Sequence, residues 1–354
     1  MKYVENSNVL VTGGAGFIGS ALVESLLEHG NTVTVLDNLF SGKVSNIPEQ
    51  PNLSFICGDI TCRLDCIDAC KAMDYVFHQA AVGSVPRSIA NPFLTTEVNV
   101  MGTLNMLIAA RDAGVKRFVY ASSSSVYGDS AELPKVEERI GNPLSPYAIS
   151  KRCNELHAMN FQQLYGLETV GLRYFNVYGR RQDPDSAYAA VIPKWAKELI
   201  AHQSPTIYGD GSNSRDFTYV DDVVQANHLA ALAPAEATGT AYNVAGGKRT
   251  TMRELFLYLR TALAQNDDEL HTLDFAYAPE RVGDVAHSLA STDKARLHIG
   301  YVPQFSFADG IREAAKWYWD NRTVEKGSST PVKPSLSPKP SADTEQEPER
   351  ILGA

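Results

Sequence analysis

Asn8-Val9-Leu10-Val11-Thr12-Gly13-Gly14-Ala15-Gly16-Phe17-Ile18-Gly19 is the stretch that decides the expected fold. Its apolar start predicts a buried strand, and the glycines predict a tight turn that opens a helix. The glycines match the Gly-x-Gly-x-x-Gly fingerprint between a strand and a helix. Bare backbone lets a pyrophosphate approach the N–H groups at the helix start, and the helix dipole favours its charge. The segment therefore predicts a dinucleotide site.

Short apolar runs alternate with long helical patterns through the first half of the chain. Strands are predicted at residues 9–11, 33–36, 53–57, 75–78, 118–121 and 169–172, and long helices at 93–113, closed by Gly114, and at 147–165. This alternation predicts an α/β fold, a Rossmann-type doubly wound parallel sheet. Beyond about residue 176 the pattern becomes irregular, which predicts a smaller mixed C-terminal lobe.

These patterns suggest three segments. We expect a dinucleotide-binding domain over residues 1–175, to which the chain returns near 217–245 and 286–293. A substrate-binding lobe over 176–322 would be interleaved with it. Residues 323–354 are rich in Pro, Ser and Glu and contain few apolar residues. This tail is expected to be disordered because it cannot bury enough surface to offset its ordering entropy.

Composition narrows the class of protein. The 354 residues carry a formal net charge of -9, which argues against non-specific binding to nucleic acid or to an anionic membrane. Neither a membrane-spanning run nor a secretory signal is visible, so a cytoplasmic enzyme is expected. Cys62, Cys66 and Cys70 would form one stripe on a helix. We interpret them as small buried apolar residues, and no metal site is predicted.

Asp37 follows the second predicted strand, 18 residues after Gly19. A carboxylate at this place accepts hydrogen bonds from both ribose hydroxyls and repels a 2′-phosphate, so NAD is favoured over NADP. The alternative is an ordinary Asp-Asn turn. Gly58-Asp59-Ile60 would contact the adenine, and Gln79-Ala80-Ala81 would pass beside the pyrophosphate and ribose.

Tyr147 and Lys151 lie four residues apart, on one face of the predicted helix. A tyrosine is a poor base at neutral pH because its usual pKa is about 10. The lysine ammonium and the charge of an oxidised nicotinamide would favour the phenolate. Ser123, at the end of the fifth strand, would hold the substrate hydroxyl in line. The alternative is a chance tyrosine-lysine pair on a solvated helix.

With these elements in place, residues 5–322 resemble the extended short-chain dehydrogenase/reductase family and, within it, the nucleotide-sugar 4-epimerases. The resemblance is carried by Gly83-Ser84-Val85-Pro86-Arg87-Ser88, Leu172-Arg173-Tyr174-Phe175-Asn176-Val177-Tyr178-Gly179, Ser214-Arg215-Asp216-Phe217 and Arg281-Val282-Gly283-Asp284. Residues 179–184 and 187–195 are similar to the UDP-N-acetylglucosamine 4-epimerases that prefer N-acetylated sugars.

The resemblance implies a set of site residues. The expected cofactor contacts are Gly13, Gly16, Phe17, Ile18, Gly19, Asp37, Asn38, Gly42, Asp59, Ile60, Gln79, Ala80, Ala81, Asn99, Tyr147, Lys151 and Tyr174. The expected substrate contacts are Ser84, Arg87, Ser123, Ser125, Tyr147, Asn176, Ala190, Val191, Lys194, Tyr208, Arg215, Arg249, Arg281, Asp284 and Ser288. Among these, Val191 and Tyr208 would border the uracil, and the arginines would neutralise the diphosphate.

The resemblance also narrows the reaction. Related 4,6-dehydratases carry an Asp-Glu pair after the strand-end hydroxyl, and related decarboxylases carry a glutamate there. This chain has Ser124 and Ser125, which disfavours elimination. Ser288 occupies the position that borders the C2 substituent of the hexose in these epimerases. Because serine is small, it leaves room for an N-acetyl group.

The expected function is the reversible conversion of UDP-N-acetylglucosamine to UDP-N-acetylgalactosamine through a 4-keto intermediate, supplying sugars for surface polysaccharide. NAD would stay tightly bound and would not be consumed. A homodimer is expected through the helices at 93–113 and 147–165. The open alternatives are a UDP-glucose or UDP-uronic acid 4-epimerase, a dehydratase or reductase, and a non-enzymatic NAD-sensing protein.

Overall fold

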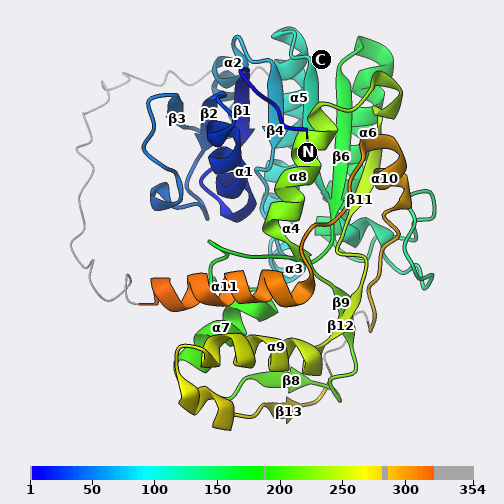
Figure 1. Ribbon diagram of the computed structural model, residues 1–354. Helices are drawn as coiled ribbons and strands as arrows, with labels where there is room; N and C mark the ends of the chain where they lie inside the picture. The colour runs from blue at the N-terminus through cyan, green and yellow to red at the C-terminus, as the bar shows by residue number, and fades with distance from the viewer. Residues whose placement is uncertain (1, 187–188, 281–285, 323–354) are drawn as a thin grey trace, which may run out of the picture. The chain divides into compact units, whose positions relative to one another are not determined.

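Seven parallel strands form the central sheet of this computed structural model, in the order β11-β6-β5-β4-β1-β2-β3 (Figure 1). The strands are β1 (Asn8–Thr12), β2 (Thr32–Asp37), β3 (Leu53–Cys57), β4 (Tyr75–His78), β5 (Arg117–Ser123), β6 (Glu168–Tyr174) and β11 (Thr240–Val244). The predicted Rossmann-type sheet and its first six strands are confirmed. Strand order reverses between β1 and β4, and ligands of such sheets bind at the carboxyl ends beside this reversal.

The structure describes residues 2–186, 189–280 and 286–322. The predicted tail, residues 323–354, lies outside the described residues.

Helices cover both faces of the sheet. They are α1 (Phe17–Glu28), α2 (Arg63–Cys70), α3 (Val85–Ala90), α4 (Pro92–Thr96), α5 (Thr103–Asp112), α6 (Pro146–Tyr165) and α8 (Val220–Ala231). Side chains alternate along the strands. Val9 and Val11 pack with α1 and α8 on one face, whereas Leu10 packs with α2, α5 and α6 on the other. Burial on both faces explains why these strands are continuous apolar runs.

The helix predicted over residues 93–113 is present without a break, because every residue from 92 to 112 is helical. It contains a π-helical turn, Glu97–Gly102, between α4 and α5, which the sequence did not indicate. Its predicted end is confirmed, because Gly114 adopts a left-handed φ of 69° just after the helix. A π turn inserts an extra residue into the helix and re-aims the side chains that follow it, a feature that is frequent at functional sites.

The remaining elements follow β6 in the chain. They are β7 (Val177–Tyr178), α7 (Val191–Ile200), β8 (Thr206–Tyr208), β9 (Ser214–Asp216), β10 (Thr218–Tyr219), β12 (Arg249–Thr251), α9 (Met252–Ala264), β13 (Ala276–Ala278), α10 (Asp293–Ile299) and α11 (Phe307–Asn321). Strands β8 and β13 pair, as do β9 and β12 and also β7 and β10. β11 belongs to the central sheet and α8 packs against it, so the chain leaves that sheet after β6 and returns to it.

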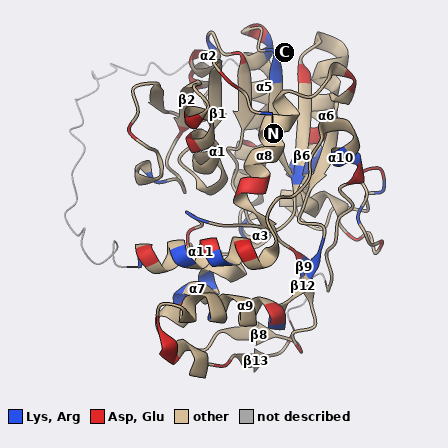
Figure 2. Cartoon of the chain, in the orientation of Figure 1, with Lys and Arg blue, Asp and Glu red and all other residues tan. Residues whose placement is uncertain are grey.

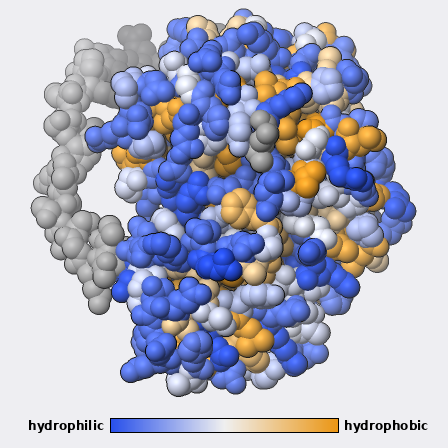
Figure 3. All heavy atoms as spheres, viewed as in Figure 1, coloured by the Kyte–Doolittle hydropathy of each residue, from blue (hydrophilic) through white to orange (hydrophobic). Residues whose placement is uncertain are grey.

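Two aspects of the described residues bear on the sequence predictions. Cys66 and Cys70 are buried in the core, and burial raises the pKa of both thiols to about 12, while Cys62 is exposed. No described helix combines the length and the apolar character needed to cross a membrane. The face shown in Figure 3 is mostly hydrophilic, with small scattered apolar areas.

Candidate active site

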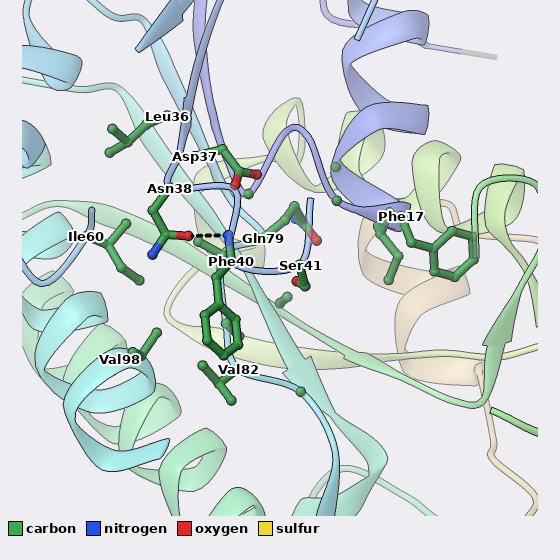
Figure 4. Close-up of a pocket in the computed structure, with 18 of the residues that line it drawn as sticks. Phe17, Leu36, Asp37, Asn38, Phe40, Ser41, Ile60, Gln79, Val82 and Val98 are labelled. Carbon is green, nitrogen blue, oxygen red and sulfur yellow. Dashed lines mark hydrogen bonds between the residues drawn. The ribbon is translucent and has the colours of Figure 1, made fainter. Parts of the chain in front are cut away.

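A cavity of about 580 Å³ lies at the carboxyl ends of β1, β2, β4 and β5. Figure 4 shows side chains from the glycine turn and from the segments after β2 and β4 around it. The predicted cofactor residues that line it are Gly13, Gly16, Phe17, Ile18, Gly19, Asp37, Asn38, Asp59, Ile60, Gln79, Ala80, Ala81, Tyr147, Lys151 and Tyr174. Ser123 also lines it. The fold thus brings the glycine turn and the tyrosine-lysine helix to one cavity.

The glycine turn leaves no room for side chains. Gly13 has a φ of 69°, and a Cβ on it would lie 2.7 Å from the Ala80 backbone nitrogen. A Cβ on Gly19 would lie 2.1 Å from the Gly13 carbonyl oxygen, so the first turn of α1 packs directly on the loop. This packing presents the N-terminus of α1, which starts at Phe17, to the cavity.

Asp37 ends β2 with a carboxylate that the backbone orients. Its Oδ2 accepts from the Ala15 N–H at 2.9 Å, and its Oδ1 accepts from the Leu39 N–H at 2.8 Å. Next to it, Asn38 donates to Asp59 at 2.7 Å. Burial opposes ionisation of Asp59, but hydrogen bonds from Thr61 and Asn38 hold its pKa below the usual range. This rim of the cavity therefore presents two ordered carboxylates.

Three side chains close a ring of hydrogen bonds at the end of β4. The Tyr174 hydroxyl donates to Gln79 Oε1 at 3.0 Å, Gln79 Nε2 donates to Asn227 Oδ1 at 3.0 Å, and Asn227 Nδ2 donates to the Tyr174 oxygen at 2.9 Å. Burial raises the pKa of Tyr174, so its hydroxyl stays neutral. The ring fixes the orientation of the Gln79 amide beside the cavity.

His78 lies in a buried chain of hydrogen bonds beneath the cavity. The Thr103 hydroxyl donates to the Asn99 carbonyl at 2.6 Å, so it accepts from His78 Nε2, 2.9 Å away. On the other side, Thr12 Oγ1 lies 2.8 Å from His78 Nδ1 and accepts from the Ala80 N–H at 3.3 Å. Its own proton therefore points to Nδ1. Donor and acceptor counting assigns His78 the neutral Nε2–H tautomer.

The protonation state of His78 agrees with this assignment. Burial, together with the charge of Lys151, lowers the pKa of His78 to about 3. A protonated ring would bring two donors against the Thr12 and Thr103 hydroxyls and would lose its acceptor. The chain of hydrogen bonds thus links β1 to the π turn through a neutral imidazole.

Asn99, in the π turn, continues this chain toward the catalytic helix. Its Oδ1 accepts from the Val82 N–H at 2.8 Å, and its Nδ2 donates to the Val82 carbonyl and to Ser150 Oγ. Ser150 donates in turn to the Tyr147 carbonyl at 2.8 Å. Both amide protons of Asn99 are thus used within the protein, and Asn99 does not line the cavity. Asn99 therefore holds Val82, which lines the cavity, in place through hydrogen bonds to its backbone.

Tyr147 and Lys151 occupy the first turns of α6. Helix α6 begins at Pro146, and the Ser145 hydroxyl caps it by accepting from the Ala148 N–H at 3.1 Å. Lys151 Nζ donates to the Ala121 carbonyl at 2.8 Å and lies 5.9 Å from the centroid of the Tyr147 ring. The predicted trio meets at one cavity, because Ser123, Tyr147 and Lys151 all line it.

The electrostatics of the trio differ from the expectation. Burial raises the pKa of Tyr147, and the hydrogen bond with Ser123 opposes this rise. Lys151 is not among the groups that shift the tyrosine pKa, and burial lowers the pKa of Lys151 itself to about 8. The protein alone thus keeps the phenol neutral. Activation of the phenol by Lys151 and by the charge of an oxidised nicotinamide stays a prediction.

A buried ion pair supports the catalytic strand from below. Glu155, two turns after Tyr147 on α6, accepts from the Ser122 hydroxyl and from Arg173 Nε, both at 2.7 Å. Arg173 also donates to the Tyr127 hydroxyl at 3.1 Å. Burial opposes ionisation of Glu155, but the Arg173 guanidinium holds its pKa below the usual range. The pair ties α6 to β5 and β6 beneath Ser123.

Comparison with known proteins decides the family. The model of the NAD dependent epimerase/dehydratase family matches residues 9–245. The chain belongs to this family.

Its relatives include sugar-nucleotide epimerases and dehydratases. The UDP-N-acetylglucosamine 4-epimerase of Methanobrevibacter ruminantium, solved with UDP-N-acetylmuramic acid, is 40% identical, with a TM-score of 0.84 over 90% of this chain and 100% of that one. The Thermus thermophilus UDP-glucose 4-epimerase, solved with NAD, is 37% identical, with a TM-score of 0.78 over 88% and 99%. The UDP-glucose 4-epimerase of Mycolicibacterium smegmatis is 38% identical, over 87% of this chain and 97% of its own length. Other relatives are dTDP-glucose 4,6-dehydratases and a UDP-glucuronate 4-epimerase.

The cofactor of this epimerase/dehydratase family member is NAD, and its cavity fits that group. The bare Gly13 backbone, where a Cβ would collide with Ala80, leaves room for a pyrophosphate at the α1 N-terminus. The Asp37 carboxylate, held by two backbone N–H groups, retains lone pairs for ribose hydroxyls. Gly42 does not line the cavity; a Cβ on it would lie 2.8 Å from the Ala15 Cβ, so it supports the turn.

The predicted substrate residues of the lobe lie outside this cavity. Asn176, with a φ of 35°, donates to the Asp216 carbonyl at 2.9 Å and to Ser288 Oγ at 3.3 Å. Ala190 precedes α7, which starts at Val191 and carries Lys194, and Tyr208 ends β8. Arg281 and Asp284 lie outside the described residues.

Basic residues lie on β9 and β12, where Figure 2 shows the ribbon in blue. These strands are antiparallel, with Arg215 opposite Thr250 and Arg249 opposite Asp216. Because opposite residues share a face and successive residues alternate, Arg215 and Arg249 leave opposite faces of the two strands. The role of Arg215 and Arg249 in neutralising the diphosphate stays a prediction.

The other substrate residues lie near the catalytic trio and on α3. The Ser125 hydroxyl oxygen is buried and has no hydrogen-bond partner among the described residues, as expected of a group that contacts a ligand. Ser84 caps α3 by accepting from the Arg87 N–H at 3.3 Å. The Arg87 guanidinium lies over the Phe40 ring.

Sequence reasoning missed part of the cavity wall. The additional lining residues are Leu36, Phe40, Ser41, Thr61, Val82, Gly83, Leu94, Glu97, Val98, Ala121, Ser122 and Val177, whereas Gly58 lines the cavity as predicted. Several directly follow predicted strands, which is a usable signal because such residues gather at one edge of a parallel sheet. Leu94, Glu97 and Val98 enter through α4 and the π turn, which no sequence pattern indicated.

Proposed function

We propose that this chain interconverts UDP-N-acetylglucosamine and UDP-N-acetylgalactosamine by removing and returning hydrogen at C4 of the sugar. One observation carries the reaction type. The lining residues from β5 and α6 are Ala121, Ser122, Ser123, Tyr147 and Lys151, which supply hydroxyls and an amine but no carboxylate. Elimination of water needs an additional acid or base beside the sugar, whereas epimerisation needs one proton acceptor.

The chain's own residues supply the proton transfers. Tyr147 takes the proton of the 4-hydroxyl, and Ser123, which lines the same cavity, holds that hydroxyl in line. NAD, when bound, accepts a hydride from C4 and later returns it. Lys151 donates a hydrogen bond to the Ala121 carbonyl, and this bond holds the N-terminal part of α6 against β5. The 4-keto sugar turns over while its UDP group keeps it in the site.

The substrate proposal depends on the neighbourhood of Asn176. Ser288 Oγ lies 3.3 Å from Asn176 Nδ2, and the Ser288 N–H donates to the Ser214 carbonyl. A small side chain thus stands next to the residue expected to contact the sugar, and it leaves space for an N-acetyl group. Arg215 would neutralise the diphosphate, and Tyr208 with Val191 would border the uracil.

A comparison of substrates tests this assignment. Purified protein is given UDP-N-acetylglucosamine, UDP-glucose and UDP-glucuronic acid separately, and the products are identified by NMR. We expect the 4-epimer to form fastest from the acetylated sugar. We expect Ser288→Tyr to lower the rate of epimerisation of UDP-N-acetylglucosamine more than that of UDP-glucose. A 4-keto-6-deoxy product would instead make the chain a dehydratase. A preference for UDP-glucose or UDP-glucuronic acid would support the corresponding alternative.

A second experiment tests the proton acceptor. Tyr147→Phe is expected to lower kcat about 10²- to 10⁴-fold, the usual contribution of a general base. Tyr165→Phe, at the exposed end of the same helix, is the matched control and should keep its kcat. Full activity of Tyr147→Phe would refute the mechanism.

The proposed assembly is a homodimer through α4, the π turn and α6. These helices pack against one another and present exposed apolar side chains: Phe93, Met101, Ile149 and Leu156 are 75%, 50%, 52% and 43% exposed. Apolar side chains on adjacent helices are typical of a subunit interface. Light scattering should give two chains per particle, and Phe93→Glu should shift the particle toward one chain.

A further inference from the structure

Phe40 and Arg87 meet beside the NAD cavity, although they come from segments 47 residues apart in the sequence. The guanidinium carbon of Arg87 lies 5.5 Å from the centroid of the Phe40 ring, within the range of a cation–π contact. Phe40 lines the cavity, and Figure 4 shows its side chain projecting toward Val82. Arg87 is not a lining residue, so it holds the ring without forming the wall.

The loop after β2 aims Phe40 at this place. Asp37 Oδ1 accepts from the Leu39 N–H at 2.8 Å, and Asn38 Oδ1 accepts from the Phe40 N–H at 3.0 Å (Figure 4). Leu39 adopts a left-handed φ of 59°, which is unfavourable for a residue with a Cβ. The ring itself is 56% exposed, so packing in the core does not explain why the loop holds it there.

The segment that carries Arg87 has a matching feature. Ser84 has a φ of 91°, and its hydroxyl accepts from the Arg87 N–H as the cap of α3. The residues just before it, Val82 and Gly83, line the cavity. Non-glycine residues held at positive φ are concentrated at ligand clamps, where the surrounding structure maintains the strain. Each of the two segments that form the Phe40–Arg87 contact contains one such residue, Leu39 in the first and Ser84 in the second.

We propose that Phe40 and Arg87 form a clasp over the NAD cavity, whose cation–π contact must open before the cofactor leaves. The aromatic ring covers the cavity beside Asp37 and Val82, and the guanidinium keeps the ring in place. The clasp rests on NAD binding in this cavity and is independent of which sugar is the substrate. It supplies a structural reason for a cofactor that is retained from one turnover to the next.

The test measures release of NAD directly. Protein loaded with radiolabelled NAD is mixed with excess unlabelled NAD, and the label that remains bound is followed through spin columns. Phe40→Leu keeps an apolar cover but removes the π face, and Arg87→Met keeps the aliphatic stem but removes the charge. Each substitution should speed release about two- to fivefold, the factor expected for an exposed cation–π contact. Arg87→Lys should retain part of the effect.

The double variant makes the test specific to the contact. Because both substitutions break the same interaction, the double variant should release NAD no faster than the faster single variant. Tyr277→Ala is the matched control: this ring is 57% exposed and lies under Arg253 at 5.9 Å, but it does not line the cavity, so release should be unchanged. Release at the wild-type rate in either single variant, or factors that multiply in the double variant, would overturn the clasp.

Discussion

His78→Leu tests the buried chain of hydrogen bonds that links the glycine turn to the catalytic helix. The imidazole accepts from Thr12 at 2.8 Å and donates to Thr103 at 2.9 Å. Leucine leaves the Thr12 proton buried without an acceptor, which costs about 1–3 kcal/mol, and loses a second hydrogen bond worth about 0.5–1.5 kcal/mol. We expect the free energy of unfolding to fall by about 2–4 kcal/mol.

A double variant separates the hydrogen bond from packing. Thr12→Val has nearly the shape of threonine and removes the donor that His78→Leu leaves stranded. When both partners of a hydrogen bond are replaced with apolar groups, no polar group of that bond is left buried without a partner. The free energy of unfolding of the double variant should therefore fall by about 1 kcal/mol or more less than the sum of the two single losses. Urea unfolding followed by circular dichroism gives the three values. Strict additivity would mean that the two groups do not interact.

The tautomer has an independent readout. In ¹⁵N NMR, His78 should keep a proton on Nε2 and none on Nδ1 between pH 5 and pH 9, because burial and the Lys151 charge lower its pKa to about 3. Titration of the ring near its usual value of about 6.5 would refute the reasoning. If the chain of bonds positions Tyr147 through Asn99 and Ser150, folded His78→Leu should lose kcat while its KM for the sugar nucleotide changes little.

Further predictions concern the cofactor, the buried ion pair and pH. Asp37→Asn places an amide where two N–H groups point, and it should weaken NAD binding about tenfold or more by calorimetry while reducing discrimination against NADP. Glu155→Gln leaves Arg173 buried without its counter-charge and should cost about 3–5 kcal/mol in urea unfolding, whereas Glu132→Gln, in an exposed pair, should cost less than about 1 kcal/mol. Burial lowers the pKa of His228 to about 4, so the unfolded chain binds more protons between about pH 4 and pH 6.5. His228 should therefore contribute about 3 kcal/mol to the fall in the free energy of unfolding as the pH drops through this window, and this contribution should be lost in His228→Gln.

Local patterns were sufficient for the sheet and for the cofactor half of the site. The apolar run before Gly13 predicted β1, and the spacing to Asp37 predicted a carboxylate at the end of β2. Both depend on contacts close in the chain, where glycine geometry and strand burial restrict the residues allowed. Tyr147 and Lys151 were found for the same reason, because helical spacing places them on one face.

Other features depend on contacts between distant residues and leave no local signal. The ring of Gln79, Tyr174 and Asn227 joins residues up to 148 positions apart, and each amide or hydroxyl is ordinary in its own segment. The π turn was missed because its apolar spacing resembles that of an ordinary helix. Its identifying contact is that of Asn99 with Val82, 17 residues away.

The electrostatic expectation was incomplete for a different reason. The spacing of Tyr147 and Lys151 suggested a direct effect of the ammonium on the phenol, but sequence contains no information on depth. In the fold Lys151 is buried and Tyr147 is partly buried, and desolvation raises the pKa of the tyrosine and lowers that of the lysine. The Lys151 ammonium lies 5.9 Å from the centroid of the Tyr147 ring and donates to the Ala121 carbonyl.

The seventh strand of the sheet comes late in the chain. β11 pairs with β6, and Val244 lies 70 residues beyond its partner Tyr174. A ribosome that adds about 5–20 residues per second needs roughly 4–14 s to make that interval. During this time β6 is the bare edge of an otherwise complete sheet, and bare edges recruit other strands. The greatest risk of aggregation during the synthesis of this polypeptide therefore falls between the emergence of Tyr174 and that of Val244.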